Sequence, residues 1–204
     1  MHKKTTLSEL KSKERQDRKD LIIDAAERVF STRPFDRVSM REIAVEAGIA
    51  ASSIYTYFPN QEALFMEATV RDSNTFIEEL RKTVADSDIT LDTLDHLIET
   101  FIDFISTHDS YFRMMVIFMT HGKISSESMQ KLNELVREGF GIYETVFQKL
   151  GYRGDTRILA HYFFAMLNGI LVNYRNLDGR REEEVIAYMK KVGKVFRELL
   201  LHSI

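Results

Sequence analysis

Side chains that carry hydroxyl groups cluster between residues 51 and 57, in a pattern suited to binding nucleic acid. At helical spacing Ile54 and Phe58 turn inward and hold the segment by packing. The residues around them then face outward: Ala51, Ser52, Ser53, Tyr55, Thr56 and Tyr57. Hydroxyl groups can bond phosphate oxygens or base edges, and an alanine can meet the methyl group of thymine. We therefore predict that this face contacts DNA.

The flanking residues predict the elements that would position this face. Ser39 and Glu42 form a capping box that starts a short helix. Gly48 lets the chain turn at low cost, since glycine accepts a left-handed backbone. A second short helix over residues 50–58 ends at Pro59, because the residue before a proline is pushed out of the helical region. This is the layout of a helix-turn-helix, although a plain helix hairpin in an all-α core is the alternative.

The same run resembles the DNA-binding domain of the TetR family of transcriptional regulators. The matching residues are 38–44, 47–49, 54–58 and 60–64, within roughly residues 18–66. The resemblance implies an all-helical homodimer whose three N-terminal helices bind operator DNA and whose C-terminal domain binds a small molecule and dimerises. It implies that Arg41 in the first helix of the motif reaches a base or phosphate. Ser39, at the start of the same helix, is a further candidate for contact with DNA. The resemblance also assigns recognition-helix contacts to Ser52, Ser53, Tyr55, Thr56 and Tyr57.

The chain departs from the family at Gln61, where members often carry a lysine that touches a phosphate. The lost charge implies fewer phosphate contacts, or compensation from the N-terminal arm. That arm is basic: seven Lys/Arg stand among the first twenty residues, and residues 1–60 have a balance of +2 although the whole chain has a net charge of −3. The arm has two open interpretations, a DNA-contacting segment or a solvated, frayed tail.

Composition excludes several classes of protein. The 204 residues contain no cysteine, which excludes disulfides and thiolate zinc sites. No apolar run reaches the roughly 20 residues of a membrane span, and residues 1–6 lack the apolar core of a signal peptide, so a cytoplasmic location is expected. We find no glycine-rich phosphate loop, nucleophile elbow or metal-ligand pair. We therefore expect no enzymatic activity, no cofactor and no metal.

Apolar residues at helical spacing predict about nine helices in two domains. Residues 1–66 would hold the arm and the helix-turn-helix domain, and residues 67–204 a helical domain for ligand binding and dimerisation. A long helix over about residues 60–85 would join them without a flexible linker. Five more helices are predicted: 91–107, 109–119, 125 or 126–150, 155 to about 178, and 181–202.

Aromatic and methionine residues concentrated after residue 100 could line a pocket for an apolar or aromatic small molecule. Polar groups within these apolar runs are stronger markers, since burial demands a partner. The candidate ligand-binding residues are His108, Tyr111, Phe112, Met115, Phe118, Met119, Tyr143, Phe147, His161, Phe164 and Asn168. The alternative for each is an ordinary core position, and for His161 a histidine bonded within the core or an interface.

The last two predicted helices carry more apolar surface than one chain needs, which indicates a symmetric four-helix interface. Gly193 within the final helix suggests close packing by another helix. The candidate dimerisation residues are Ile158, Tyr162, Met166, Ile170, Tyr174, Met189, Gly193, Phe196 and Leu200. A monomer with a wide core is the alternative.

These features predict a homodimeric, ligand-responsive transcriptional regulator, in particular a repressor that a small molecule releases from operator DNA. The alternative is a helical module whose two halves bind other proteins. Salt-sensitive, sequence-specific DNA binding distinguishes the two, because phosphate contacts release counterions.

Overall fold

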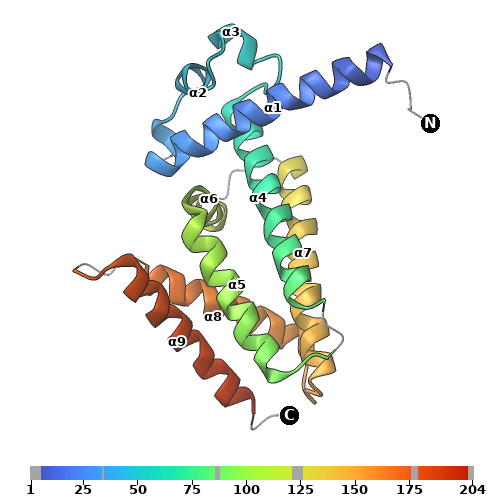
Figure 1. Cartoon of the computed structure of the whole chain (residues 1–204), viewed down its shortest axis with the longest axis vertical. Coiled ribbons are helices and arrows are strands. Elements are labelled where there is room, and N and C mark those ends of the chain that lie inside the picture. Colours follow the sequence, from blue (N-terminus) through green and yellow to red (C-terminus); the bar gives the residue numbers. More distant parts are fainter. Residues whose placement is uncertain (1–5, 34, 86–87, 121–125, 176–178, 202–204) are drawn as a thin grey trace. The chain divides into compact units, whose positions relative to one another are not determined.

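The computed structural model describes residues 6–33, 35–85, 88–120, 126–175 and 179–201, and all regular elements among them are helical. The predicted all-α fold class is confirmed. The elements, labelled in Figure 1, are α1 (Leu7–Thr32), η1 (Phe35–Arg37), α2 (Met40–Glu46), α3 (Ala51–Ile54), α4 (Gln61–Thr83), α5 (Leu91–Thr107), α6 (Asp109–Thr120), α7 (Ser126–Lys149), α8 (Thr156–Tyr174) and α9 (Glu182–Leu200). None of the helices in the described part of the chain is both long and apolar enough to cross a membrane.

The chain divides into two compact units, and it crosses from one to the other within α4, at the start of α6 and near the start of α7. The first unit comprises Met1–Arg71 and Ser110–Ser128, and the second comprises Asp72–Asp109 and Met129–Ile204. The predicted functions of residues 1–66 and 67–204 stay predictions.

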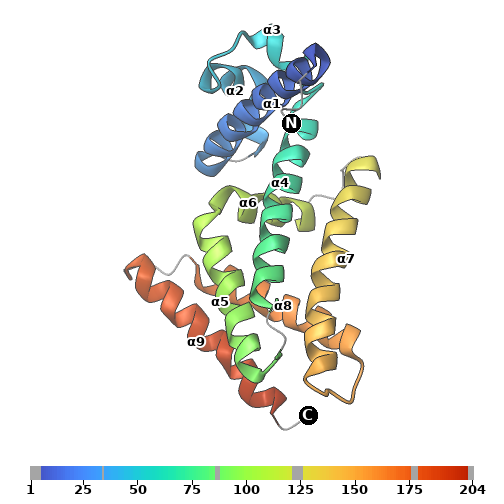
Figure 2. The same ribbon diagram turned by 45° about the vertical axis from the view of Figure 1, so that its right-hand side comes forward.

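An aromatic cluster holds the first unit together. The rings of Phe30 on α1, Phe35 on η1 and Phe65 on α4 lie with centroids 4.6–5.8 Å apart. Ile43 and Ala44 on α2 are completely buried, and α2 and α3 lie on the same side of α1 in both views (Figures 1 and 2). The small residues of α2 therefore allow α1 to pack closely, as helix packing requires.

The described part of the N-terminal arm is helical from Leu7, so this part is not the frayed tail that one interpretation of the sequence allowed. A capping box starts α1: the backbone N–H of Glu9 donates to the Thr6 hydroxyl at 3.2 Å, and the Thr6 N–H donates to the Glu9 carboxylate at 2.7 Å. This box satisfies two N–H groups at the start of the helix.

In the second unit α5 and α9 pack side by side (Figures 1 and 2). A row of ion pairs fixes their antiparallel register, because the residue numbers of the partners increase along α9 as those of the partners on α5 decrease. The pairs are Lys190–Asp103, Lys194–Glu99, Arg197–Asp95 and Arg197–Asp92. Behind this row, a Cβ atom on Gly193 would lie 2.5 Å from Cγ2 of Ile98. Close packing by α5 of the same chain therefore accounts for the glycine.

Two helices were predicted to be longer than they are in the structure. The helix predicted to run from 155 to about 178 ends at Tyr174, and residues 176–178 lie outside the described residues. The helix predicted over 50–58 is α-helical only over Ala51–Ile54. The N–H groups of Tyr57 and Phe58 both bond the carbonyl of Ile54, at 3.0 Å each, so the last turn is tightened. Because Phe58 precedes Pro59, the helical region is disfavoured for it, and no helix continues beyond this turn.

Candidate nucleic-acid interface

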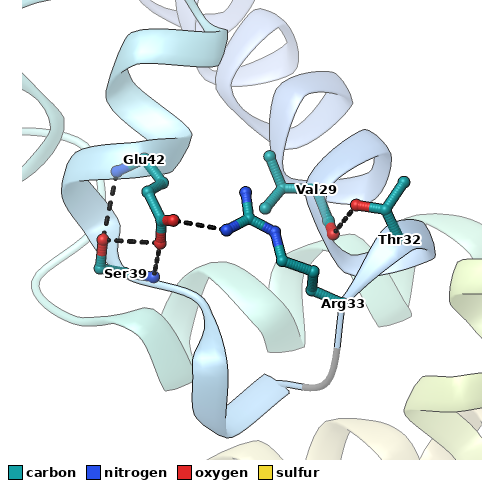
Figure 3. Close-up of polar contacts among 5 residues, drawn as sticks. All are labelled: Val29, Thr32, Arg33, Ser39 and Glu42. Carbon is teal, nitrogen blue, oxygen red and sulfur yellow. Dashed lines mark hydrogen bonds and ion pairs between the residues drawn. The ribbon is translucent and has the colours of Figure 1, made fainter.

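A capping box fixes the start of α2 (Figure 3). The Ser39 N–H donates to the Glu42 carboxylate at 2.8 Å, and the Glu42 N–H donates to the Ser39 hydroxyl at 3.3 Å. Arg33 at the end of α1 donates to the other carboxylate oxygen at 2.6 Å. The hydrogen bonds from Ser39, followed by that from Arg33, lower the pKa of Glu42 below its ordinary value. The predicted box is confirmed, and its negative charge at the N-terminus of α2 complements the helix dipole.

The turn between α2 and α3 depends on the backbone of Gly48. Its φ is +68°, in the left-handed region that side-chain-bearing residues avoid. The Gly48 N–H bonds the carbonyl of Val45 and the Ile49 N–H bonds that of Ala44, at 3.1 and 2.9 Å. No described atom lies within 4 Å of where a Cβ on Gly48 would stand, so the conformation, not space, requires the glycine.

The residues predicted to contact DNA stand on the outer side of this turn. Ile54 is completely buried and Phe58 is 2% exposed, and they hold the segment to the core. Among the predicted contact residues, Tyr57 is half-buried. The other seven are exposed: Ser39, Arg41, Ala51, Ser52, Ser53, Tyr55 and Thr56. Ser39 is also committed to its cap, since its hydroxyl lies 2.9 Å from the Glu42 carboxylate. Their contact with DNA stays a prediction.

Three cations on α1 approach the end of the same segment. The Arg15 guanidinium lies 3.4 Å from the carbonyl oxygen of Thr56 and 5.7 Å from the Tyr57 ring centroid. Hydrogen bonds to Tyr57 and then to Glu14 raise the pKa of the Arg18 guanidinium. The Lys19 ammonium lies 5.5 Å from the ring centroid of Phe58. The spacing of the motif did not reveal these residues, although the basic run in the arm was a signal for them.

A hollow of about 310 Å³ lies between α1 and the turn. Its walls carry one guanidinium, three hydroxyl groups and several apolar residues. The lining residues are Arg18, Leu21, Ile22, Ile49, Ala50, Ser53, Thr56 and Tyr57. A cation beside hydroxyl donors is the chemistry that binds a phosphate group.

Gln61, the departure from the family pattern, has a role within the fold. Its side-chain amide donates to the carbonyl of Phe35 at 2.7 Å and is half-buried. Beside it the Ala63 N–H donates to the side chain of Asn60 at 2.8 Å, so Asn60 caps the start of α4. Gln61 therefore joins the start of α4 to η1.

The predicted ligand-binding residues fall in both units. On α6, in the first unit, Tyr111 is buried and Phe112 and Met115 are half-buried. The side chains of Phe118 and Met119 lie outside the described residues.

The other candidates belong to the second unit, where neighbouring residues partly account for them. Tyr143 and Phe147 are core residues, 2% and 0% exposed, and both pack on Phe163. His161 is exposed in the chain, with its ring centroid 4.0 Å from that of Phe140, so it is not a core residue, and its predicted place in a ligand site or an interface stays a prediction. Asn168 is half-buried and donates to the carbonyl of Phe164 at 2.8 Å.

His108 ends α5, with its ring stacked on Phe104 at a centroid distance of 3.9 Å. A separate hollow of about 370 Å³ in the second unit contains none of the predicted ligand-binding residues. It is lined by Val84, Ile89, Glu138, Gly141, Ile142, Thr145, Val146 and Lys149. The ligand site stays a prediction.

The predicted dimerisation residues divide by exposure. Ile158 and Tyr162 are 67% and 58% exposed, and Met166 and Tyr174 are half-buried. The remaining five are buried within the unit, where packing in the chain accounts for them: Ile170, Met189, Gly193, Phe196 and Leu200. Four exposed apolar residues on the same two helices were not among the candidates: Val172, Tyr188, Val195 and Leu199.

A short capped helix, a left-handed glycine turn and a second short helix with exposed hydroxyl groups define a helix-turn-helix DNA-binding domain. Residues 22–68 match the family described as "Bacterial regulatory proteins, tetR family". The resemblance drawn from the sequence is thus confirmed for the DNA-binding domain, where residues 22–68 match this family.

One relative is similar to the N-terminal part of the chain in sequence, and two solved structures are similar to most of it in fold. An uncharacterized HTH-type transcriptional regulator of Mycobacterium tuberculosis is 37% identical over 67 residues, which are 33% of this chain and 33% of that protein. FadR of Bacillus subtilis in complex with stearoyl-CoA has a TM-score of 0.71 at 20% identity, covering 90% of this chain and 98% of FadR. AibR in complex with isovaleryl coenzyme A and operator DNA has a TM-score of 0.68 at 20% identity, covering 85% of this chain and 96% of AibR. The two solved structures show a common fold along most of the chain.

Proposed function

We propose that this protein is a homodimeric, ligand-responsive transcriptional regulator that represses genes by binding operator DNA and leaves it when a small molecule binds. The face formed by α3, the turn after it and the cations of α1 carries this proposal. It offers hydroxyl groups for base edges and positive charge for phosphates, on a scaffold that Gly48 and the capped α2 hold rigid.

A second copy of the chain is the partner that the exposed apolar residues of α8 and α9 fit. The two helices are antiparallel neighbours, since the ring centroids of Tyr162 and Phe196 lie 6.1 Å apart and those of Tyr174 and Tyr188 lie 5.3 Å apart. At 100° per residue, the exposed apolar residues of each helix lie on one side of it: Ile158, Tyr162 and Val172 on α8, and Tyr188, Val195 and Leu199 on α9. Pairing this face with its copy gives a four-helix bundle with two-fold symmetry. A dimer then presents two recognition segments about 34 Å apart, one turn of DNA.

The effector we propose is a small molecule with a substantial apolar part. The second unit contains a cluster of aromatic rings, in which the ring centroid of Phe164 lies 6.1 Å from that of Phe101 and 5.3 Å from that of Phe140. FadR and AibR, which share the fold, were solved with stearoyl-CoA and isovaleryl coenzyme A. An acyl-CoA is therefore the first class of effector to test. Release from DNA requires that the effector bind the state with lower DNA affinity more tightly, because a ligand shifts an equilibrium only by its differential affinity.

Fluorescence anisotropy on a labelled duplex that contains the region upstream of the protein's own gene tests the proposal. We expect salt-sensitive binding that an unlabelled specific duplex displaces better than a scrambled one. Acyl-CoAs of two to eighteen carbons are then titrated into the complex, with free coenzyme A as the control. Equal displacement by specific and scrambled duplexes would refute regulation through operator DNA and favour the protein-interaction module. Specific binding that no acyl-CoA weakens would refute only this class of effector.

A further inference from the structure

The first three turns of α1 form an exposed extension whose role the contacts above do not explain. Every residue from 7 to 18 is exposed, so burial does not hold this segment in place. Its helicity is supported by the Thr6–Glu9 box, the Arg18–Glu14 ion pair at 2.8 Å and continuity with the buried part of α1. A helix this short is marginal in water alone, but as part of α1 it carries its side chains outward at fixed angles.

One face of this extension carries Lys11 and Arg15, and the opposite face carries most of the carboxylates. Ile22, 1% exposed, marks the face of α1 that turns toward the core. At 100° per residue, Arg15 and Lys11 lie two and three turns before Ile22 on nearly the same line. Lys13 lies about 180° away from Ile22, on the opposite face. That face also carries three of the four carboxylates between residues 7 and 20: Glu9, Asp17 and Asp20.

The positive face is continuous with the end of the recognition segment. Arg15 already lies 3.4 Å from the carbonyl of Thr56 and against the ring of Tyr57. Lys11, one turn further out, stands about 6 Å beyond Arg15 along the helix axis. A duplex that meets Thr56 and Tyr57 therefore continues past Arg15 toward Lys11.

We infer that the extension of α1 is a second DNA-binding element, in which Lys11 and Arg15 bind backbone phosphates that flank the bases read by α3. The inference rests on the proposed function and adds to it the partner of the N-terminal residues. A duplex is the occupant that the charges favour, because its phosphates form a dense row of negative charge. The exposed Leu7 and Leu10 would suit a protein partner instead, but they stand off the line of Lys11 and Arg15, by about 60° and 120° relative to Ile22.

Two lysines on opposite faces of the extension provide a matched test. Lys11→Gln and Lys13→Gln remove the same charge from the same exposed helix, and circular dichroism checks that each variant keeps its helix content. Binding of the full chain is measured by anisotropy between about 50 and 200 mM salt, on the operator duplex and on a nonspecific duplex of equal length. We expect Lys11→Gln to lower the slope of log K against log salt by about 0.9 for each chain bound, and Lys13→Gln to leave it unchanged.

The possible outcomes separate this inference from the proposed function. Equal slopes for the two variants, with specific binding retained, would overturn the inference and leave the regulator intact. A wild-type protein with no sequence preference would overturn the regulator, and the slopes on the nonspecific duplex would still decide the role of Lys11. A salt slope that neither lysine substitution changes would refute the inference. The exposed Leu7 and Leu10 would then be the residues to test for binding of a protein partner.

Discussion

The carboxylate of Glu99 on α5 pairs with the ammonium of Lys194 on α9 at 2.6 Å. The hydrogen bond from Lys194 is the main reason that the pKa of Glu99 is lowered, and the same bond raises the pKa of Lys194. The pair stands midway along the row of ion pairs between the two helices, beside Lys190 and Arg197. Because both partners are about two-fifths exposed or slightly less, solvent screens the pair and its contribution is small.

This pair predicts a pH-dependent coupling in stability. A carboxyl group with a lowered folded-state pKa stabilises the protein above its unfolded pKa, and that contribution is lost as the pH falls below about 4.3. A double-mutant cycle of Glu99→Gln and Lys194→Met should give a coupling of about 0.5 kcal/mol at pH 7 and a smaller one at pH 3. Urea denaturation at both pH values measures it. A coupling that stays constant between them would show that the charge of Glu99 does not contribute.

The close approach of α5 to Gly193 predicts that this position tolerates no side chain. Gly193→Ala would place a methyl group 2.5 Å from Cγ2 of Ile98, and we expect a destabilisation of about 1–3 kcal/mol from overpacking. Ile98→Leu removes the branch at Cβ, so Gly193→Ala should cost less in that background. Chemical denaturation of the four combinations measures the difference.

Gly141 on α7 is the matched control for this substitution. No described atom lies within 4 Å of where its Cβ would stand, and the residue is exposed within a helix. Gly141→Ala should therefore stabilise the protein by up to about 1 kcal/mol through helix propensity. Equal effects of alanine at the two glycines would contradict the role assigned to Ile98.

Local features of the sequence predicted the helix-turn-helix well, because their causes lie within a few residues. The cap needs only Ser39 and Glu42, three positions apart, and the turn needs only the backbone freedom of Gly48. The contact of Arg15 with Thr56 joins residues 41 positions apart. Such a contact depends on how α1 crosses the later helices, and periodicity carries no information about that crossing.

The same distinction explains Gly193 and the dimerisation candidates. The sequence showed an unusual glycine in a helix, but it did not show whether the neighbouring helix belongs to the same chain. The structure places Ile98, 95 residues earlier, against it. Apolar periodicity likewise identifies the buried stripe of α9 better than its exposed one, so the dimerisation candidates included the buried Phe196 and not the exposed Leu199.

The exposed face of α8 and α9 predicts how the dimer can be broken. Leu199 is 63% exposed, so Leu199→Glu should leave the fold of the chain unchanged while it places a charge, twice by symmetry, in the proposed interface. We expect at least a tenfold weaker dimer by sedimentation velocity across a concentration series. Leu10→Glu, at an exposed leucine of α1, is the control and should keep the wild-type mass. A monomeric wild-type protein would exclude this interface.

Tyr57 predicts a loss of DNA affinity without a change of assembly. Its half-buried ring lies against Arg15, and its hydroxyl bonds Arg18, so the side chain both faces the proposed duplex and positions two cations. Tyr57→Ala should weaken operator binding about tenfold or more, since base and phosphate contacts of this kind contribute about 1–3 kcal/mol each.

Tyr57→Phe separates the two roles of this side chain. It keeps the ring against Arg15 and removes only the hydroxyl, so it should lose less affinity than Tyr57→Ala. Anisotropy measures the affinities, and sedimentation should give the wild-type dimer for both variants, because Tyr57 belongs to the first unit and the proposed interface to the second. If Tyr57→Ala dissociates the dimer, or if it binds operator DNA as tightly as the wild type, then Tyr57 does not lie in the DNA interface.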